Sequence, residues 1–263
     1  MNTATAPVAD TSVSRESLFA YSLRLADDAL ICGQRLAEWS SKAPSLELDI
    51  ALSNQSLDLF GQARMLYDYA ARIEGKGRSE DDLAFLRDGL DFTNLLMVEL
   101  PNGDFAHTTV RQFLFSARNL LAWEALAGSA DAELAAIAAK AVKELTYHMR
   151  HSGEWMVRLG DGTDESHNRA QAALDALWPY TGEMFEADAL DAEMTAAGIG
   201  FDPRSLRAPW LAMVEPAIAR ATLARPADGH MHGGGRKGRH SEHLGYILAE
   251  MQYLQRAYPG SKW

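Results

Sequence analysis

Apolar residues recur at helical spacing along most of this 263-residue chain. One stripe comprises Leu18, Tyr21, Leu25, Ala29, Cys32, Leu36 and Trp39, and the next comprises Leu48, Leu52, Gln55, Leu59, Gln62, Leu66 and Ile73. This spacing places the members of each stripe on one face of an α-helix. Because no segment shows the strict alternation of a β-strand, the sequence predicts an all-α protein, a bundle of long helices with a helical C-terminal extension.

The turn and capping signals divide this pattern into elements. We expect long helices over 46–73 and 108–127, and another that begins after the N-cap Asp131 and reaches residue 159. A shorter helix is expected over 81–98 and a last one over 240–256. Residues 1–16 are rich in Ala, Thr, Ser and Pro, which predicts a disordered tail, and 17–263 are expected to form one domain.

Composition excludes several classes of protein. The formal net charge of -11 argues against a nucleic-acid partner, because phosphate backbones select basic surfaces. No apolar run approaches the length of a membrane-spanning helix, and the N-terminus lacks the pattern of a secretory signal. The one cysteine, Cys32, lies on an apolar stripe and is expected in the core. Together these features lead us to expect a cytoplasmic protein.

Two segments, Leu46–Arg64 and Lys140–Arg150, have the character of helices that hold a carboxylate-bridged di-iron centre. Such a bundle needs E-x-x-H on two facing helices, so that a carboxylate and an imidazole aim at one metal pair. No Glu lies three residues before any of the eight histidines. The first segment has Leu59 and Gln62 at these positions, and the second has Leu145 and His148. The sequence therefore predicts a degenerate di-iron site, with no metal and no catalytic residue in this chain.

Glu144 and His148 are four residues apart and share a helix face, with Lys140 one turn earlier. The pattern is compatible with half of a non-standard metal site in an independent metal-binding protein or enzyme. We favour a structural interpretation, a buried cluster in which Lys140 supplies the positive charge that iron would supply, because buried charges persist only when paired. A ferritin-like storage or binding protein that works alone is a third hypothesis.

Two further kinds of pattern, histidine-containing pairs and a glycine-rich stretch, could also bind a ligand. Four histidine-containing pairs have the spacing of possible zinc ligands but lack further ligands: His148 with His151, His240 with His243, Asp104 with His107, and Asp164 with His167. The stretch Gly233–Gly238 opens onto a helix and contains Arg236 and Lys237, followed by Arg239. Its backbone N–H groups and basic side chains could bind a phosphate or an anionic partner, or the stretch could be a flexible connection.

Five long motifs carry a resemblance to a known family. They read RLADDALICGQRLAEW, LELDIALSNQSLDLFGQAR, DFTNLLMVELPNGDFAHT, AKAVKELTYHMRHSGEWMVRLGDGTDES and GGRKGRHSEHLGYILAEMQYLQRAYPG. With these motifs the chain resembles, from about Leu18 to Trp263, the C-subunit family of the bacterial multicomponent phenylacetyl-CoA epoxidases, also called ring 1,2-phenylacetyl-CoA monooxygenases.

The resemblance implies a ferritin-like fold and a non-catalytic structural role in aerobic phenylacetate catabolism. It implies pairing with a homologous catalytic A subunit that binds di-iron and the CoA thioester. A small B subunit and an NADPH-dependent reductase are the further partners it implies. It also implies that phenylacetyl-CoA lies near the A–C interface. The segments that would contact it here are Asp91, Phe92, Thr93 and Asn94, and the poorer match Ala192, Glu193 and Met194.

Overall fold

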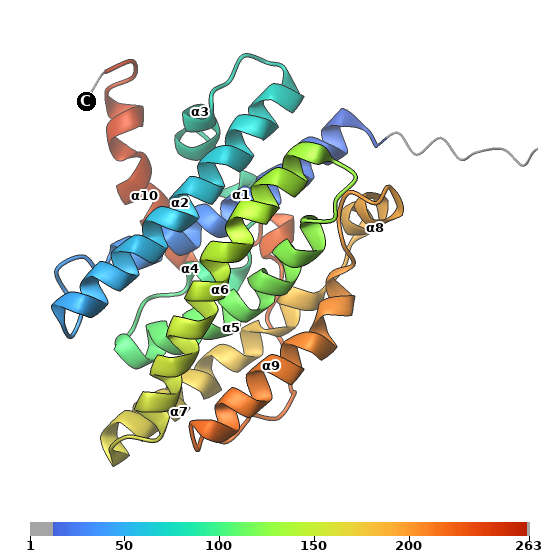
Figure 1. The fold of residues 1–263 in the computed structure, drawn as a ribbon. Helices are drawn as coiled ribbons and strands as arrows, with labels where there is room; N and C mark the ends of the chain where they lie inside the picture. Colours follow the sequence, from blue (N-terminus) through green and yellow to red (C-terminus); the bar gives the residue numbers. More distant parts are fainter. Residues whose placement is uncertain (1–12, 262–263) are drawn as a thin grey trace, which may run out of the picture.

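The fold is built around four long helices. The computed structural model describes residues 13–261. Helices α1 (Arg15–Ala37) and α2 (Leu46–Glu74) form one closely packed pair, and α5 (Phe105–Leu126) and α6 (Ala132–Gly160) form the other. Figure 1 shows the four helices together at the centre of the molecule, with α6 crossing in front of α5. Contacts between α2 and α6 join the two pairs.

Shorter elements surround this bundle. Helices α7 (Asp164–Leu177) and α9 (Arg207–Arg220) pack against α5 and α6, whereas α10 (Glu242–Ala257) packs against α1, α3 and α4 at the opposite end (Figure 1). The remaining α-helices are α3 (Glu80–Phe85), α4 (Leu96–Glu99) and α8 (Ala189–Ala196). The 3-10 turns are η1 (Gly89–Asp91), η2 (Trp178–Tyr180), η3 (Gly182–Phe185), η4 (Pro203–Leu206) and η5 (Gly235–Lys237). Within residues 13–261 there is no strand, so the all-α prediction is confirmed.

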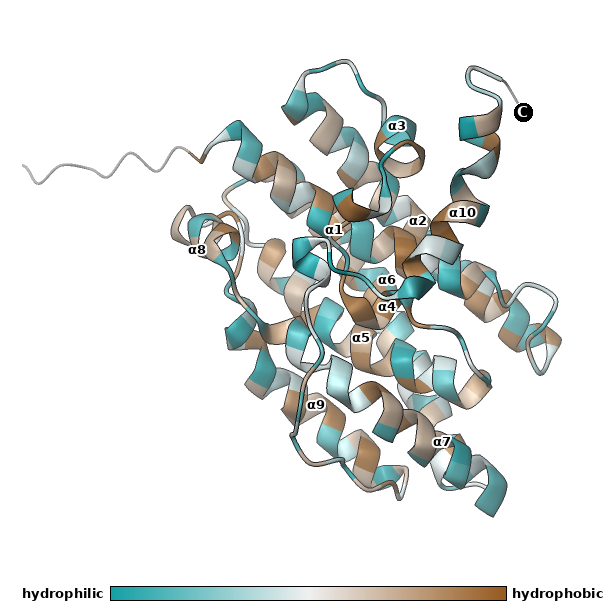
Figure 2. Cartoon of the chain, turned by 180° about the vertical axis from the view of Figure 1, so that it is seen from behind, coloured by the Kyte–Doolittle hydropathy of each residue, from teal (hydrophilic) through white to brown (hydrophobic). Residues whose placement is uncertain are grey.

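Helices α2 and α6 bury one face in a continuous apolar core, whereas α1 and α5 are buried on nearly all sides over most of their length. Figure 2 shows hydrophobic and hydrophilic residues recurring along the same helices, as expected where one face is buried and the other is exposed. The largest side chains in the core include Trp178, Trp210, Phe113 and Phe115. In the described part of the chain, no helix combines the length and the hydropathy that crossing a membrane requires.

Two boundaries differ from the sequence expectations. The predicted tail 1–16 falls mostly on residues outside the described range, and α1 already begins at Arg15. The expected helix over 81–98 is wrong, because the segment is divided into α3, η1 and α4 with extended backbone between them. The backbone N–H groups of Thr93 and Leu95 donate to carboxylates of α1 instead of to a preceding helical turn. A helical periodicity in the sequence cannot reveal such a competition.

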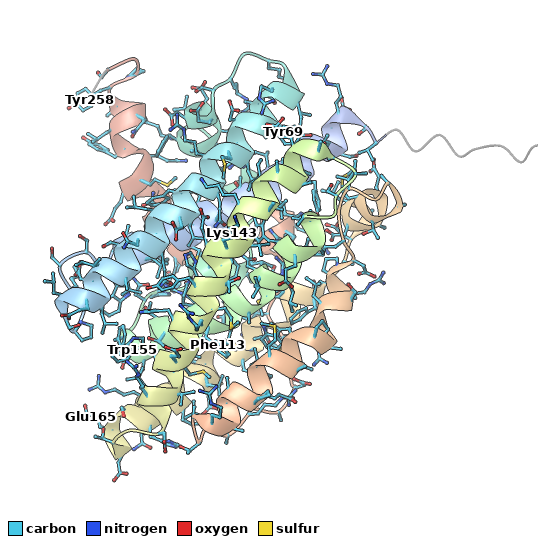
Figure 3. All side chains as sticks on the ribbon, viewed as in Figure 1. Tyr69, Phe113, Lys143, Trp155, Glu165 and Tyr258 are labelled. Atoms are coloured by element: carbon cyan, nitrogen blue, oxygen red, sulfur yellow. The ribbon has the colours of Figure 1, made fainter. Side chains whose placement is uncertain are left out.

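The start of α6 shows how side chains fix these boundaries. Asp131 is its N-cap, as predicted, and its Oδ1 accepts the backbone N–H groups of Glu133 and Leu134. The hydroxyl of Tyr69 on α2 donates to the other oxygen of the same carboxylate. Figure 3 shows Tyr69 beside this end of α6. One aspartate therefore caps α6 and ties it to α2.

We predict that Asp131→Ala lowers the free energy of unfolding by about 1–3 kcal/mol, because the cap is lost and the Tyr69 hydroxyl loses its acceptor. Asp131→Asn keeps an acceptor oxygen and is expected to cost less than half as much. Urea unfolding followed by circular dichroism measures both. Equal losses in the two variants would contradict the capping explanation.

Candidate functional site at the α2–α6 seam

The positions expected to hold metal lie where α2 and α6 face each other. Three polar pairs bridge the helices: Gln55 Nε2 to His151 Nδ1 at 3.1 Å, Asp58 Oδ2 to His148 Nε2 at 2.9 Å, and Gln62 Nε2 to Glu144 Oε2 at 2.9 Å. Each advance along α2 matches an equal step back along α6, so the helices run antiparallel here. We call these six residues the α2–α6 seam.

Two leucines occupy the interior positions where a metal site would need ligands. Leu59 and Leu145 have exposed fractions of 0% and 1%. Their side chains carry no atom that can coordinate iron, and the amide of Gln62 donates to Glu144. No group of three or more His, Cys, Asp or Glu side chains among residues 13–261 has the arrangement of a metal site. The residues present therefore do not fit a carboxylate-bridged di-iron centre.

The seam is only partly satisfied. The Oε1 atoms of Gln55 and Gln62 and the Nδ1 atom of His148 are buried and have no hydrogen-bond partner in the described structure. An unpaired buried polar atom costs roughly 1–3 kcal/mol. Burial also lowers the pKa of His151, which disfavours the charged imidazole beside Gln55. The seam therefore joins α2 and α6, but its unpaired buried atoms make it less stabilising than a fully hydrogen-bonded contact would be.

The other helix pair contributes no metal ligand near Cys32. The thiol of Cys32 on α1 contacts Gln112 Oε1 on α5 at 3.5 Å, and the Gln112 amide donates to Ser116. Burial raises the pKa of Cys32 to about 12, so the thiol stays protonated at neutral pH. A protonated thiol is neither a nucleophile nor a metal ligand. The expectation that Cys32 is a core residue is confirmed.

The expected buried cluster of Lys140, Glu144 and His148 is wrong in its composition. The Lys140 side chain is 60% exposed and its Nζ lies 4.0 Å from Glu144, a contact worth little in water. His148 is fully buried, but its partner is Asp58. Asp58 and Gln62 share the face of α2 that carries Gln55, so their spacing could have identified them. The partners of His148 and Glu144 lie across the seam on α2, and not along α6.

The remaining histidine pairs do not form joint sites. Asp104 caps α5 through the backbone N–H of His107, and His167 contacts the carbonyl oxygen of Gly160. His240 lies between Glu99 Oε2, at 2.7 Å, and the carbonyl oxygen of Phe92, at 2.8 Å. Burial alone would lower the pKa of His240, but these two contacts outweigh it and raise the pKa. The imidazoles of His167 and His240 are therefore used in local structure.

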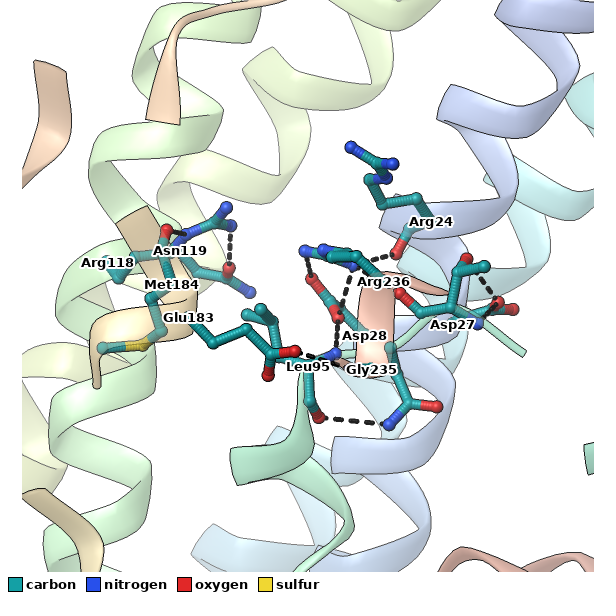
Figure 4. Close-up of polar contacts among 12 residues, drawn as sticks. Arg24, Asp27, Asp28, Leu95, Arg118, Asn119, Glu183, Met184, Gly235 and Arg236 are labelled. Atoms are coloured by element: carbon teal, nitrogen blue, oxygen red, sulfur yellow. Dashed lines mark hydrogen bonds and ion pairs between the residues drawn. The ribbon is translucent and has the colours of Figure 1, made fainter. Parts of the chain in front are cut away.

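A buried ionic cluster beneath α1 organises the C-terminal part of the chain (Figure 4). Arg236 reaches Asp28 Oδ2 at 2.6 Å and the carbonyl oxygen of Thr93 at 2.8 Å. Asp28 Oδ1 accepts the backbone N–H of Leu95. Asp27 accepts the hydroxyl of Tyr67 and the backbone N–H of Thr93, and also pairs with Arg87. Two adjacent aspartates thus position the segment that follows η1.

The glycine-rich stretch binds an anion, as its backbone suggested, but the anion belongs to this chain. The backbone N–H groups of Gly234 and Gly235 donate to Glu183 Oε1 at 2.8 and 2.7 Å, and Leu96 N–H donates to Glu183 Oε2 at 2.7 Å. Position 235 accommodates no residue larger than glycine, since a Cβ there would lie 2.2 Å from the carbonyl oxygen of Asn94. The expectation of an external anionic partner for Arg236 is wrong, whereas Lys237 and Arg239 are exposed.

Arg118 is a buried cation of a different kind. Its guanidinium contacts the carbonyl oxygen of Met184 and the side-chain oxygen of Asn119 (Figure 4). It also lies over the Phe201 ring. Burial, together with nearby Arg236, lowers the pKa of Arg118 to about 10. Arg118 is therefore still charged at neutral pH, although none of its hydrogen bonds in the described structure is to a carboxylate.

Comparison with known proteins now identifies the family. The family model described as phenylacetic acid catabolic protein matches residues 1–263. The chain belongs to this family. It is 51% identical over 246 residues to the C subunit of the 1,2-phenylacetyl-CoA epoxidase of Escherichia coli (strain K12), and the match covers 94% of this chain and 99% of that protein. The family resemblance and the ferritin-like helical fold predicted from the sequence are confirmed.

The segment 91–94, one of two expected near a substrate in this family, is mostly structural. Phe92 and Asn94 are fully buried, and Asp91 is exposed. The Arg87 guanidinium lies over the Phe92 ring, 4.2 Å from its centre. The amide nitrogen of Asn94 donates to Glu99, while its Oδ1 is buried without a partner among the described residues. Of these four residues Asp91 alone is exposed, and its Oδ2 accepts the backbone N–H of Asp88.

The second segment, 192–194, contacts a different part of α1. Ala192 and Glu193 are exposed and Met194 is fully buried. Glu193 Oε2 accepts the hydroxyl of Ser17 at 2.7 Å, whereas Thr93 contacts α1 at Asp27. Ser17 and Asp27 are about 15 Å apart along a helix axis. The two segments therefore lie along α1 at separate places.

We predict that Asp28→Ala lowers the free energy of unfolding by about 3–5 kcal/mol, because it leaves Arg236 buried without its carboxylate. The matched control is Asp88→Ala, which removes an exposed partner of Arg256 and is expected to cost no more than about 1 kcal/mol. Chemical denaturation of both variants tests this. A small loss for Asp28→Ala would mean that the buried pair does not stabilise the fold.

We also predict a pH dependence that originates at His240. Its folded pKa is raised above the ordinary value of about 6.5, so its stabilising contribution is complete below that pH and is lost as pH rises through the raised pKa. The difference in unfolding free energy between the wild type and His240→Gln should shrink as the pH rises above about 6.5. The half-buried His243→Gln is the control. A difference that grows with pH would contradict the assignment.

Proposed function

We propose that this chain is the non-catalytic structural subunit of a phenylacetyl-CoA epoxidase complex. In this proposal it pairs with a homologous di-iron catalytic A subunit and stabilises it, and a small B subunit and an NADPH-dependent reductase complete the system. The observation that carries the proposal is the pair of buried leucines, Leu59 and Leu145, at positions where a catalytic bundle needs ligands. The similarity to the C subunit of the Escherichia coli epoxidase along almost the whole chain supports the same role.

An exposed apolar face supports the need for a partner. Leu46, Ile50 and Leu57 on α2 have exposed fractions of 72%, 52% and 64%. Their spacing of four and seven residues places them on one side of the helix. A homologous helical bundle could cover this face with complementary side chains. We propose an obligate interface that buries more than ~2,000 Å² and is largely apolar.

Within this role, the exposed members of the two segments along α1 are the candidates for contact with phenylacetyl-CoA near the A–C interface. These are Asp91, Ala192 and Glu193. The buried residues Phe92, Asn94 and Met194 would act indirectly, by holding the backbone in place. Thr93 is half-buried and bonded to Asp27.

The second candidate function is an independent metal site at Glu144 and His148. One observation favours it, since the buried Nδ1 of His148 has no hydrogen-bond partner in the described part of the chain and imidazole is a common metal ligand. The geometry of the seam argues against it, because Glu144 and His148 bond different residues of α2, Gln62 and Asp58.

We predict that the catalytic subunit is unstable or insoluble without this chain and fails to epoxidise phenylacetyl-CoA. Co-expression with this chain should restore oxygen-dependent consumption of phenylacetyl-CoA when the other components are present. The single variant Leu57→Glu should weaken co-purification, because it places a charge in the apolar contact. Leu254→Glu, at an exposed leucine on α10 outside this face and outside the two segments along α1, is the control.

Two results would contradict the proposal. The first is full activity of the catalytic subunit alone. The second is retention of about two iron ions per chain by this protein after anaerobic loading, the number that a di-iron bundle holds. To separate the two candidate functions, Glu144→Gln with His148→Gln should leave the turnover of the assembled complex unchanged. Loss of turnover in a complex that still assembles would favour the metal site.

A further inference from the structure

Two exposed histidines face each other on the segment between α9 and η5. His230 and His232 lie in a segment without regular secondary structure, and their ring centres are 5.2 Å apart with the ring planes at 89°. No ring nitrogen of either residue forms a hydrogen bond or an ion pair within the described structure. Both imidazoles are therefore available to a ligand from solvent.

The backbone holds this pair in place. Met231, between the two histidines, packs inward against Gly182, where an added Cβ would lie only 2.7 Å from the Met231 side chain. The backbone N–H of His232 donates to the carbonyl oxygen of Pro179 at 2.8 Å, and its ring stacks on Tyr180 with 4.6 Å between centres.

The separation of the rings suits a shared metal ion. A zinc–nitrogen bond is about 2.1 Å and a ring nitrogen lies about 1.1 Å from its ring centre, so each centre would be about 3.2 Å from the metal. At a tetrahedral angle of about 109°, two such rings have centres about 5.2 Å apart. The rings already have this spacing. Rotation of the exposed His230 ring can then direct its nitrogen to the position that the stacked His232 ring defines.

We propose that His230 and His232 form a surface chelate for one divalent transition-metal cation of the Zn²⁺ and Cu²⁺ class. Imidazole is a preferred ligand for both ions. In the described part of the chain no third His, Cys, Asp or Glu completes a cluster, so water fills the remaining positions. The site lies on the surface of the C-terminal segment and is independent of the role proposed for the bundle.

The test is calorimetric titration of the tag-free full-length chain with Zn²⁺. The wild type should show one saturable site, and His230→Ala and His232→Ala should each weaken binding by about tenfold or more, as expected when a protein ligand is lost. Cu²⁺ should bind more tightly than Zn²⁺ with the same dependence on both residues. Far-UV circular dichroism should show unchanged folding, because both side chains are exposed.

Two controls make the result specific. His243→Ala removes an imidazole elsewhere on the C-terminal segment, and His148→Gln removes the imidazole with the unpaired buried nitrogen. Neither should alter the affinity for Zn²⁺. The proposal is overturned if the wild type shows no saturable site, or if binding survives the double change of His230 and His232. Zinc binding that is lost only in His148→Gln would also overturn it and would instead support metal at the seam.

Discussion

The buried carboxylates of α1 are the constraint on which the rest of the arrangement depends. Asp27 and Asp28 lie inside a helical bundle, where an unpaired charge would be prohibitively costly. They are satisfied by backbone N–H groups of the segment after η1 and by arginines from two other regions, Arg87 and Arg236. The segment after η1 must therefore leave the helical conformation. The part of the chain that carries Arg236 must return to α1. A local feature of one helix thus fixes the course of the chain 208 residues away.

Sequence reasoning predicted what depends on local periodicity. The long helices, the cap at Asp131, the buried Cys32 and the absence of E-x-x-H follow from spacing that each helix carries by itself. It failed where a partner comes from elsewhere in the chain. Two partners were missed because their relation exists only in the folded protein: Asp58, which lies opposite His148, and Glu183, which the glycine-rich stretch binds. The distance to the partner along the sequence, 90 residues in the first case, gives no local signal.

The glycine-rich stretch illustrates why a correct chemical inference can yield the wrong partner. Successive N–H groups in such a turn do form an anion site, and the residue at Gly235 has no room for a side chain. The anion is the carboxylate of Glu183, which is covalently part of the chain and therefore has a high effective concentration. An external phosphate would have to displace it. The site is thus used for folding, and Lys237 and Arg239 remain exposed for other contacts.

The α2–α6 seam shows what can hold a ferritin-like bundle together in place of coordination bonds. Hydrogen-bonded pairs contribute roughly 1 kcal/mol each, and burying a leucine contributes about 1.5–3 kcal/mol. Leu59 and Leu145 therefore stabilise the interior about as much as the polar pairs do, without the unpaired atoms that those pairs leave. A bundle selected for stability alone would replace the polar residues with apolar ones. Polar pairs nevertheless have one advantage, since a hydrogen bond requires a defined geometry and so fixes how far α2 is shifted along α6. In the proposed complex, a partner that matches the shape of this bundle would depend on that register.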